Sequence, residues 1–270
     1  MEMKLSIITI NLNNADGLRK TIKSVVSQTT NLVFEYIIID GGSTDGSVEV
    51  IKEYAERIKY WVSEPDKGIY HAMNKGIRVA EGDYCQFLNS GDWLAADDVI
   101  GKMLNPLPDC SIFYGNMLKQ LPNGKVYRDF CGKGNISMFT FYRGSLNHSP
   151  ALIKRSLFEK YGLYDETLKI VSDWKWYLVA IGLNNESVRY TDIDVTCFNM
   201  IGISNMFPEL ENQERRAVME QIIPHSILMD YDLNWKNIDM MGRINQYRIS
   251  QWLIWLLERV LFKLEKWSLL

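Results

Sequence analysis

Three short polar segments of this sequence combine residue types that bind anions or divalent cations. The first is the loop Asp40-Gly-Gly-Ser-Thr-Asp-Gly46, whose glycines allow tight turns and a close backbone approach. A helix that begins after such a loop offers free N–H groups to a phosphate. The spacing excludes two nucleotide-binding motifs, because Ser47-Val48 replaces the Lys and Ser/Thr of a P-loop and the glycines do not form GxGxxG. A plain turn between strand and helix is the alternative interpretation.

The second segment is Asn89-Ser-Gly-Asp92. A carboxylate flanked by small residues at the end of a strand can ligate a hard divalent cation that holds a diphosphate, although an Asx-type turn is the simpler alternative. The third segment, residues 64–76, gathers charged and amide side chains beside a glycine: Asp66, Lys67, Asn74 and Lys75. A solvated loop followed by an amphipathic helix would also account for it.

Alternating strands and helices are predicted to position these segments. Buried strands are expected at Leu5 to Ile10, Phe34 to Ile39, Tyr60 to Val62 and Tyr84 to Leu88. The helices between them are predicted from apolar stripes, one of them formed by Val48, Ile51, Ala55 and Ile58. Repeated β-α-β units predict an α/β fold whose sheet is mostly parallel, with helices on both faces. Ligands bind beyond the carboxyl ends of such strands, which is where the polar segments fall.

The remainder of the chain reads differently. Shorter strands are expected at Ser111 to Asn116 and Lys125 to Phe130, and helical periodicity returns from Trp174 to Ile181. After Pro208 the chain is predicted to be helical to its end, with a break at Pro224.

Composition narrows the class of protein. The chain has 270 residues, 47% of them hydrophobic and 23% charged, so it can bury a core and is not disordered. The net charge of −3 argues against a nucleic-acid-binding protein. Four cysteines form no CxxC pair, and the N-terminus does not resemble a signal peptide, so a cytoplasmic location is expected. The apolar run Trp252 to Leu257 is shorter than the roughly 20 residues of a transmembrane helix.

Taken together, these segments resemble the family 2 glycosyltransferases, inverting enzymes with the GT-A fold. The matching pieces occur in family order over about residues 4 to 180. They are Ser6 to Asn11, Ile39 to Gly46, Glu64 to Gly76, Gly82 to Asp92 and Ser172-Asp173-Trp174. The sequences of these motifs are similar to those of the family branch found in bacterial capsule, O-antigen and exopolysaccharide gene clusters.

The resemblance implies roles on the donor side. Asp40 is similar to the acid that reads the nucleotide base, and Thr9 and Asn11 lie where the first strand lines the nucleoside pocket. Asp92 matches the last acid of the DxD motif, which binds Mn²⁺ or Mg²⁺ together with the donor diphosphate. Asn89 stands in place of the first acid, so one negative charge of the pattern is missing.

The donor-binding set implied by the resemblance also includes Asp66, Lys67 and Lys75. Either lysine would add positive charge near the diphosphate.

On the acceptor side, Asp173 aligns with the catalytic base that takes a proton from the acceptor hydroxyl. Capping of the following helix by Ser172 or Asp173 is the alternative. The adjacent Trp174 is expected to stack on a sugar ring. His148 lies where relatives often carry a histidine on the acceptor side, although a lone histidine is more often structural.

The predicted function is transfer of a sugar from a nucleoside diphosphate donor, UDP-linked and of the hexose type, to a hydroxyl of a glycan or lipid-linked acceptor in surface polysaccharide biosynthesis. One alternative is a non-catalytic nucleotide-sugar-binding subunit, which Asn89 favours. Another is a nucleotidyltransferase, which would carry a glycine-rich basic loop where this chain has Asn11 to Asn14.

The resemblance also divides the chain. Residues 1–205 are predicted to form the GT-A catalytic domain, with a nucleotide-sugar-binding half (1–100) and an acceptor-binding half (101–205). Residues 206–270 are predicted to form a helical extension.

The end of this extension has an unusual composition. Residues 243–270 contain five basic and two acidic side chains and three of the eight tryptophans. Such a segment suits an amphipathic helix on the anionic inner face of the plasma membrane. A helix packed against its own domain or in a homodimer is the alternative.

Overall fold

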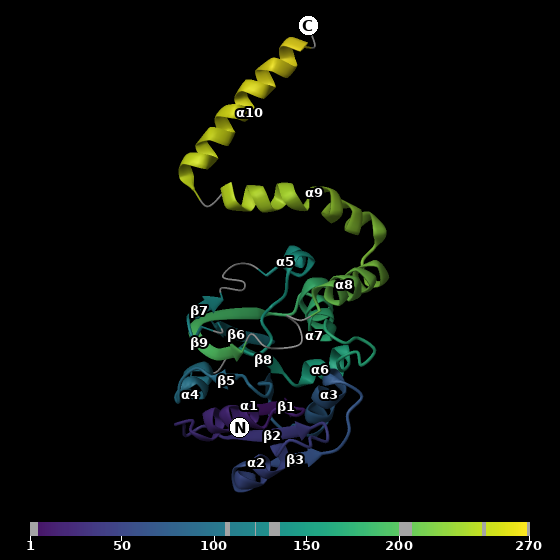
Figure 1. The fold of residues 1–270 in the computed structure, drawn as a ribbon. Helices are drawn as coiled ribbons and strands as arrows, with labels where there is room; N and C mark the ends of the chain where they lie inside the picture. Colours follow the sequence, from purple (N-terminus) through teal and green to yellow (C-terminus); the bar gives the residue numbers. More distant parts are fainter. Residues whose placement is uncertain are drawn as a thin grey trace. The chain divides into compact units, whose positions relative to one another are not determined.

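The computed structural model describes residues 5–105, 109–121, 123–129, 136–199, 207–244 and 247–268 (Figure 1). The first half alternates strands and helices: β1 Leu5–Asn11, α1 Ala15–Val26, β2 Phe34–Asp40, α2 Ser47–Glu53, η1 Ala55–Arg57, β3 Tyr60–Ser63, α3 Ile69–Val79, β4 Tyr84–Phe87, β5 Trp93–Leu94 and α4 Val99–Leu104. The second half contains β6 Ile112–Gln120, β7 Val126–Asp129, α5 Met138–Arg143, β8 Ala151–Lys154, α6 Ser156–Tyr161, α7 Ser172–Tyr177, η2 Leu178–Leu183, β9 Val188–Asn199, α8 Pro208–Ile222, α9 His225–Ile244 and α10 Arg248–Ser268.

Within the described residues, nine strands form one sheet in the order β3-β2-β1-β4-β8-β6-β9-β5, with β7 paired to β6. The pairs β3-β2, β2-β1 and β1-β4 are parallel, as are β6 and β9. Strand β8 is antiparallel to both β4 and β6 and joins the two parallel groups. The predicted α/β fold with a mostly parallel sheet is confirmed.

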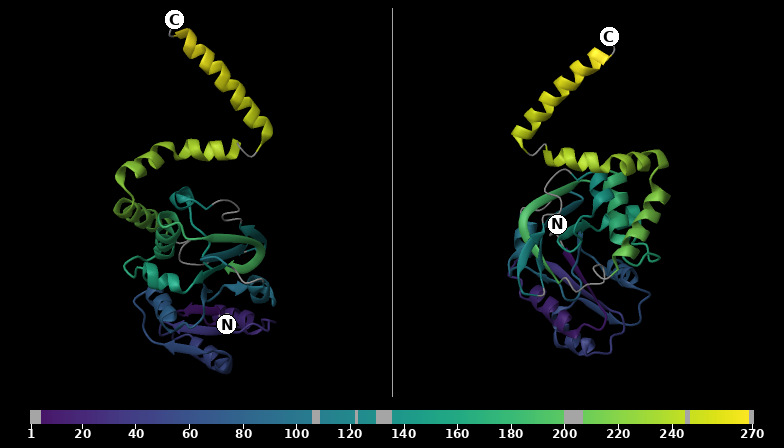
Figure 2. Two further views of the ribbon diagram at one scale, coloured as in Figure 1. Left: turned by 180° about the vertical axis from the view of Figure 1, so that it is seen from behind. Right: turned by 45° about the horizontal axis from the view of Figure 1, so that its top comes forward.

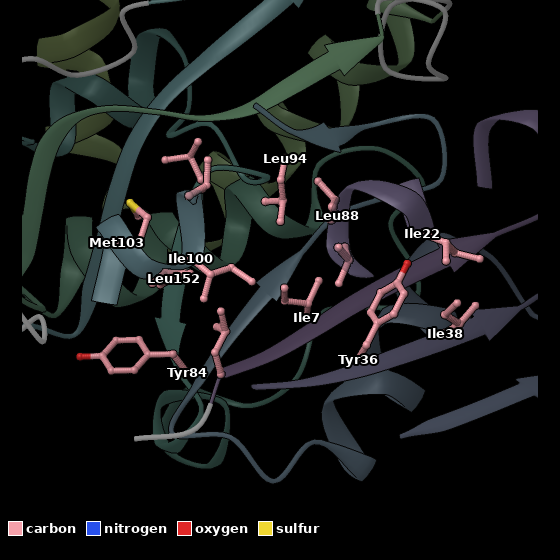
Figure 3. Close-up of a cluster of buried hydrophobic side chains, with 14 of the residues drawn as sticks. Ile7, Ile22, Tyr36, Ile38, Tyr84, Leu88, Leu94, Ile100, Met103 and Leu152 are labelled. Atoms are coloured by element: carbon pink, nitrogen blue, oxygen red, sulfur yellow. The ribbon is translucent and has the colours of Figure 1, made fainter. Parts of the chain in front are cut away.

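Side chains of β1 and β2 alternate between the two faces of the sheet, and those on both faces are mostly apolar. Helices therefore cover both faces of this region. Ile7, Tyr36 and Ile38 belong to one buried cluster with the apolar stripe of α1 (Figure 3). On the other face, Gly76 of α3 comes so close to Ile8 that an added Cβ would lie 2.4 Å from its Cγ2. Strands buried on both faces explain the continuous apolar runs of the sequence.

The second half of the sheet is less regular. Strand β9 is long and strongly curved beside β6 (Figure 2), and their register shifts on either side of Asn116. Such irregularities bend a strand and increase its twist. The strand predicted up to Phe130 ends at Asp129 in the structure, and Phe130 itself lies outside the described residues.

The helix predicted over Val48 to Ile58 is wrong in extent. Helix α2 ends at Glu53, and a short 3-10 turn follows. Val50 and Ile51 are buried, whereas Val48 is only half-buried. Hydrogen bonds from the Ser47 amide and hydroxyl to Asp45 fix the start of the helix, which sets the face that meets the sheet.

The chain separates into two compact units, residues 1–216 and 217–270. The boundary predicted after residue 205 falls in a segment outside the described residues. The expected break at Pro224 is confirmed, because α8 ends at Ile222 and α9 begins at His225. Among the described residues, no helix combines the length and hydropathy that crossing a bilayer requires.

Candidate active site

A cavity of about 1030 Å³ opens where β1, β2 and β4 end. This volume suits a ligand the size of a nucleotide sugar. Seven residues singled out from the sequence line it: Asn11, Asp66, Asn89, Asp92, His148, Asp173 and Trp174. Four others are not part of the lining: Thr9, Asp40, Lys67 and Lys75. The structure therefore brings both ends of the predicted site together, although these residues lie up to 163 positions apart in sequence (Asn11 to Trp174).

Asp40 lies behind the cavity wall and is fully buried. Its carboxylate accepts hydrogen bonds from Asn11 Nδ2 (2.7 Å), Ser63 Oγ (2.6 Å), and both the backbone N–H (2.9 Å) and Oγ (2.6 Å) of Ser43. Burial alone would raise the pKa of Asp40, but the hydrogen bonds from Ser43, Ser63 and Asn11 hold it below the ordinary value of 3.8. The ionised side chain thus ties together the ends of β1, β2 and β3. Its predicted contact with the nucleotide base stays a prediction.

Thr9 is also fully buried. Its hydroxyl donates to the Leu88 carbonyl oxygen at 2.7 Å and lies 3.0 Å from the Tyr36 hydroxyl. These contacts join β1 to the end of β4 and to β2. Its predicted place in the nucleoside pocket stays a prediction, and what the structure shows is a buried hydroxyl that links β1 to β2 and β4.

Helix α1 determines the shape of the loop from Asn89 to Asp92. The Thr21 hydroxyl donates to the Asp92 carbonyl oxygen (2.6 Å) and accepts from the Gly91 N–H (2.9 Å). Asn14 Nδ2 donates to the Ser90 carbonyl oxygen at 3.0 Å. Gly91 has φ +103°, in the left-handed region that glycine tolerates best. The loop is therefore held in one conformation by polar contacts with α1.

Oxygen atoms in this loop fit a hard divalent cation. Asn89 Oδ1 is buried without a hydrogen-bond partner, which is a costly state unless another group completes it. Asp92 is 5% exposed and lines the same cavity. Among the described residues, no three His, Cys, Asp or Glu side chains form a metal site by themselves. A cation here would therefore take its other ligands from a bound diphosphate and water.

The two lysines predicted to contact a diphosphate lie outside the cavity lining, and their donor-side role stays a prediction. Lys75 Nζ pairs with Asp66 (2.6 Å) and Glu64 (2.8 Å), and it does not line the cavity. Burial would lower the pKa of Lys75, but its hydrogen bonds to Asp66 and Glu64 raise it above the ordinary value, so the ion pairs are favoured. Lys67 is exposed and outside the lining. Asp66 does line the cavity, where it also lies 3.0 Å from His71 Nδ1.

Asp173 is placed by contacts from the opposite half of the domain. It is the second residue of α7, and its Oδ1 accepts a hydrogen bond of 2.9 Å from the Tyr70 hydroxyl on α3. The same hydroxyl contacts the Ile170 carbonyl oxygen. Burial and the nearby Asp173 raise the pKa of Tyr70 well above 10, so the phenol stays protonated and can act as a donor.

His148 is packed among aromatic rings. Its ring stacks on Phe87 at a centroid distance of 4.7 Å, and its Nε2 is 2.8 Å from the Tyr164 hydroxyl. Burial lowers the pKa of His148, and Asp173 opposes that shift. The imidazole is thus favoured as the neutral form and lies within electrostatic reach of Asp173. Its predicted acceptor-side role stays a prediction, with the structural alternative supported by this packing.

The stacking predicted for Trp174 has little room. The residue is 1% exposed, and its Nε1 donates to the Phe141 carbonyl oxygen at 2.9 Å. The Arg215 guanidinium lies 4.9 Å from its ring centroid, so one face is already covered by a cation. Its predicted stacking on a sugar ring stays a prediction, and what the structure shows is that Trp174 forms part of the cavity wall.

Several lining residues were missed by the sequence analysis. They are Asn14, Tyr70, Lys119, Lys169, Glu211 and Arg215. Glu211 and Arg215 belong to α8, beyond the predicted end of the catalytic domain. The polar segment 64–76 contains Tyr70, but its residue types do not single out this tyrosine. Nothing in a single sequence indicates that α8 contacts the backbone at Lys169, 45 residues before Glu214.

A cavity beyond the carboxyl ends of parallel strands, lined by carboxylates and a candidate cation site, is where α/β proteins bind nucleotide-type ligands. The family model described as glycosyl transferase family 2 matches residues 6–162. The chain belongs to glycosyl transferase family 2.

Relatives and solved structures agree with this assignment. An uncharacterized glycosyltransferase of Mycobacterium tuberculosis is 35% identical over 181 residues, which are 65% of this chain and 68% of the relative. A PGL/p-HBAD biosynthesis glycosyltransferase of Mycobacterium bovis is 26% identical over 217 residues, 78% of this chain and 82% of the relative.

Two solved structures show the fold. Staphylococcus aureus TarS 1-349 in complex with UDP-GlcNAc has a TM-score of 0.62 at 17% identity, covering 76% of this chain and 60% of that one. The mannosyltransferase PcManGT from Pyrobaculum calidifontis, in complex with GDP-Man and Mn²⁺, has a TM-score of 0.57 at 17% identity, covering 80% and 61%. This likeness confirms the predicted GT-A fold.

We predict that Asp40→Asn destabilises the protein by about 2–4 kcal/mol at pH 7, because an amide would turn N–H groups toward groups that donate. The pKa of Asp40 is lowered, so the stability that its ionised form contributes is present above about pH 4 and is lost as the pH falls through its folded pKa. Urea unfolding at pH 7, 5 and 3.5 should therefore show a difference from the parent that shrinks only at the lowest pH. The exposed Asp16→Asn is the control, and a difference independent of pH would contradict the account.

Proposed function

We propose that this glycosyltransferase inverts the anomeric centre while it moves a hexose-type sugar from a UDP-linked donor to a hydroxyl of a glycan or lipid-linked acceptor in surface polysaccharide biosynthesis. The observation that carries the proposal is that Asp92 and Asp173 line one cavity, with Asp173 held by the Tyr70 hydroxyl. One carboxylate is suited to the leaving diphosphate and the other to the attacking hydroxyl.

Asp173 is the proposed general base. The acceptor oxygen attacks the anomeric carbon as the bond from that carbon to the diphosphate oxygen breaks, and the acceptor proton passes to the Asp173 carboxylate. The nucleoside diphosphate leaves with the bonding electrons. The hydrogen bond from Tyr70 restricts the rotation of the carboxylate, which keeps Oδ2 available for the acceptor.

Asp92 and Asn89 are the residues that would hold Mn²⁺ or Mg²⁺ together with the donor diphosphate. The cation would neutralise charge on the leaving group when bound. The unpartnered Asn89 Oδ1 supports this assignment, and the neighbour that contains Mn²⁺ gives it further support. The UDP donor is supported by the neighbour that contains UDP-GlcNAc, and a role in surface glycan assembly by the relative named for PGL/p-HBAD biosynthesis.

Asp173→Asn should reduce sugar transfer at least about 100-fold, because the amide cannot accept the proton. Binding of UDP, measured by calorimetry, should be unchanged. The control is Asp83→Asn, an exposed residue just before β4, at the end of that strand remote from the cavity. Near-normal turnover in Asp173→Asn would remove this residue from the role of base.

Transfer should stop in EDTA and return with Mn²⁺. Because Asn89→Asp adds the missing negative charge, we expect half-maximal activity at an Mn²⁺ concentration about tenfold lower than in the parent. Asp92→Asn should shift the Mn²⁺ requirement in the opposite direction. Equal rates in EDTA and in Mn²⁺ would show that the site works without metal.

We further propose that the protein is cytoplasmic and that α10 binds the inner face of the plasma membrane. Aliphatic side chains recur at helical spacing along α10, and most are exposed: Ile249, Leu253, Leu256, Leu257, Val260 and Leu264. Beside them runs a stripe of Trp252, Trp255, Arg259 and Lys263, with the Arg259 guanidinium 4.5 Å from the Trp255 ring centroid. An apolar face next to aromatic and basic residues suits an anionic bilayer surface.

Leu257→Glu in the full chain should reduce binding to vesicles containing phosphatidylglycerol at least about tenfold, because a charge would enter the apolar face. Gln251→Glu adds the same charge elsewhere on the helix and should lose only a small electrostatic part of the affinity. Flotation measures both variants. If the parent protein does not bind vesicles and elutes as a dimer in size-exclusion chromatography, pairing of α10 with a second copy of the chain would be favoured.

A further inference from the structure

Glu214 on α8 forms hydrogen bonds with the backbone segment that precedes the proposed base, Asp173. Its Oε1 accepts a hydrogen bond from the Lys169 N–H at 2.8 Å. Its Oε2 accepts from the N–H groups of Ile170 (3.0 Å) and Val171 (3.3 Å). One carboxylate therefore binds three consecutive amides, and Val171 is the residue from which α7 starts. Asp173 follows two positions later.

The same segment is held from the other side by α3. The Tyr70 hydroxyl contacts the Ile170 carbonyl oxygen as well as Asp173 Oδ1. Glu214 thus binds the N–H side of the segment while Tyr70 binds a carbonyl within it. Tyr70 and Glu214, which are 144 residues apart in sequence, fix one short stretch of backbone, and each acts through hydrogen bonds that a shift of about 1 Å would break.

We propose that Glu214 is a positioning residue for catalysis, which acts on sugar transfer only through the placement of Asp173. This inference rests on the proposed role of Asp173 as general base. Glu214 does not line the cavity. The three residues whose N–H groups it binds, 169–171, do line it, and so does Asp173. Displacement of a catalytic group by about 1 Å from a remote substitution can cost 100-fold in rate.

The residue type suits this task. A carboxylate has two acceptor oxygens and no donor, so it can satisfy all three N–H groups at once. In Glu214→Gln, one oxygen becomes an NH₂ group that cannot accept from an N–H. The shape of the side chain is retained, so the change tests hydrogen bonding rather than packing.

A double-mutant cycle in the full chain separates positioning from a general structural effect. Glu214→Gln should lower kcat at least about tenfold and leave the affinity for UDP within about twofold of the parent. In the Asp173→Asn background, the same substitution should change the residual rate less than about twofold, because the group through which it acts is gone. Glu209→Gln, at an exposed residue of the same helix, removes the same charge and should keep full activity.

Amide hydrogen exchange measures directly whether Glu214 protects the three N–H groups that it binds. Amides of residues 169–171 should exchange at least about tenfold faster in Glu214→Gln than in the parent or in Glu209→Gln, while β1 and β4 keep their protection.

An equal loss of rate from Glu214→Gln with and without Asp173 would overturn the proposal, as would full activity of Glu214→Gln. Parent-like transfer by Asp173→Asn alone would overturn the proposed base, and that outcome is read without any Glu214 variant.

Discussion

The hydrogen bond between the Tyr70 hydroxyl and Asp173 joins the first and second halves of the sheet-containing unit at the candidate site. Tyr70 belongs to the helix that packs against β1 and β2, whereas Asp173 lies in the first turn of α7, 103 residues later. Asn74, one turn beyond Tyr70, adds hydrogen bonds to the Tyr164 backbone at 2.9 and 3.0 Å. Helix α3 thus positions the candidate base relative to the donor side of the cavity.

The same principle recurs around the cavity, where polar side chains hold the loops and strand ends beside the candidate site. Asp40 joins three strand ends, Thr21 and Asn14 shape the loop at Asp92, and Glu214 holds the segment before Asp173. The contacts of Asp40 and Thr21, which are buried, are the most specific, because an unpaired buried polar group is costly. We infer that the site is preorganised by these contacts before any ligand binds.

Much of this architecture is predictable from the sequence because local signals agree. Continuous apolar runs mark β1 and β2, and the predicted break at Pro224 separates α8 from α9. Polar residues after strands gather in one cavity because parallel strands share a carboxyl edge. The contacts that orient them are long-range and leave no periodic signal. The roles of Tyr70, Glu214 and Arg215 are therefore not predictable from the sequence, and neither are the ion pairs of Lys75 with Glu64 and Asp66.

The central claim is inverting transfer from a nucleoside diphosphate sugar with Asp173 as the base. The most direct test is the anomeric configuration of the product, read by proton NMR during turnover of UDP-GlcNAc or another UDP-sugar with a glycan or lipid-linked acceptor. The account predicts a β-linked product from an α-linked donor, with one UDP released per bond formed. An α-linked product from the same donor would contradict it.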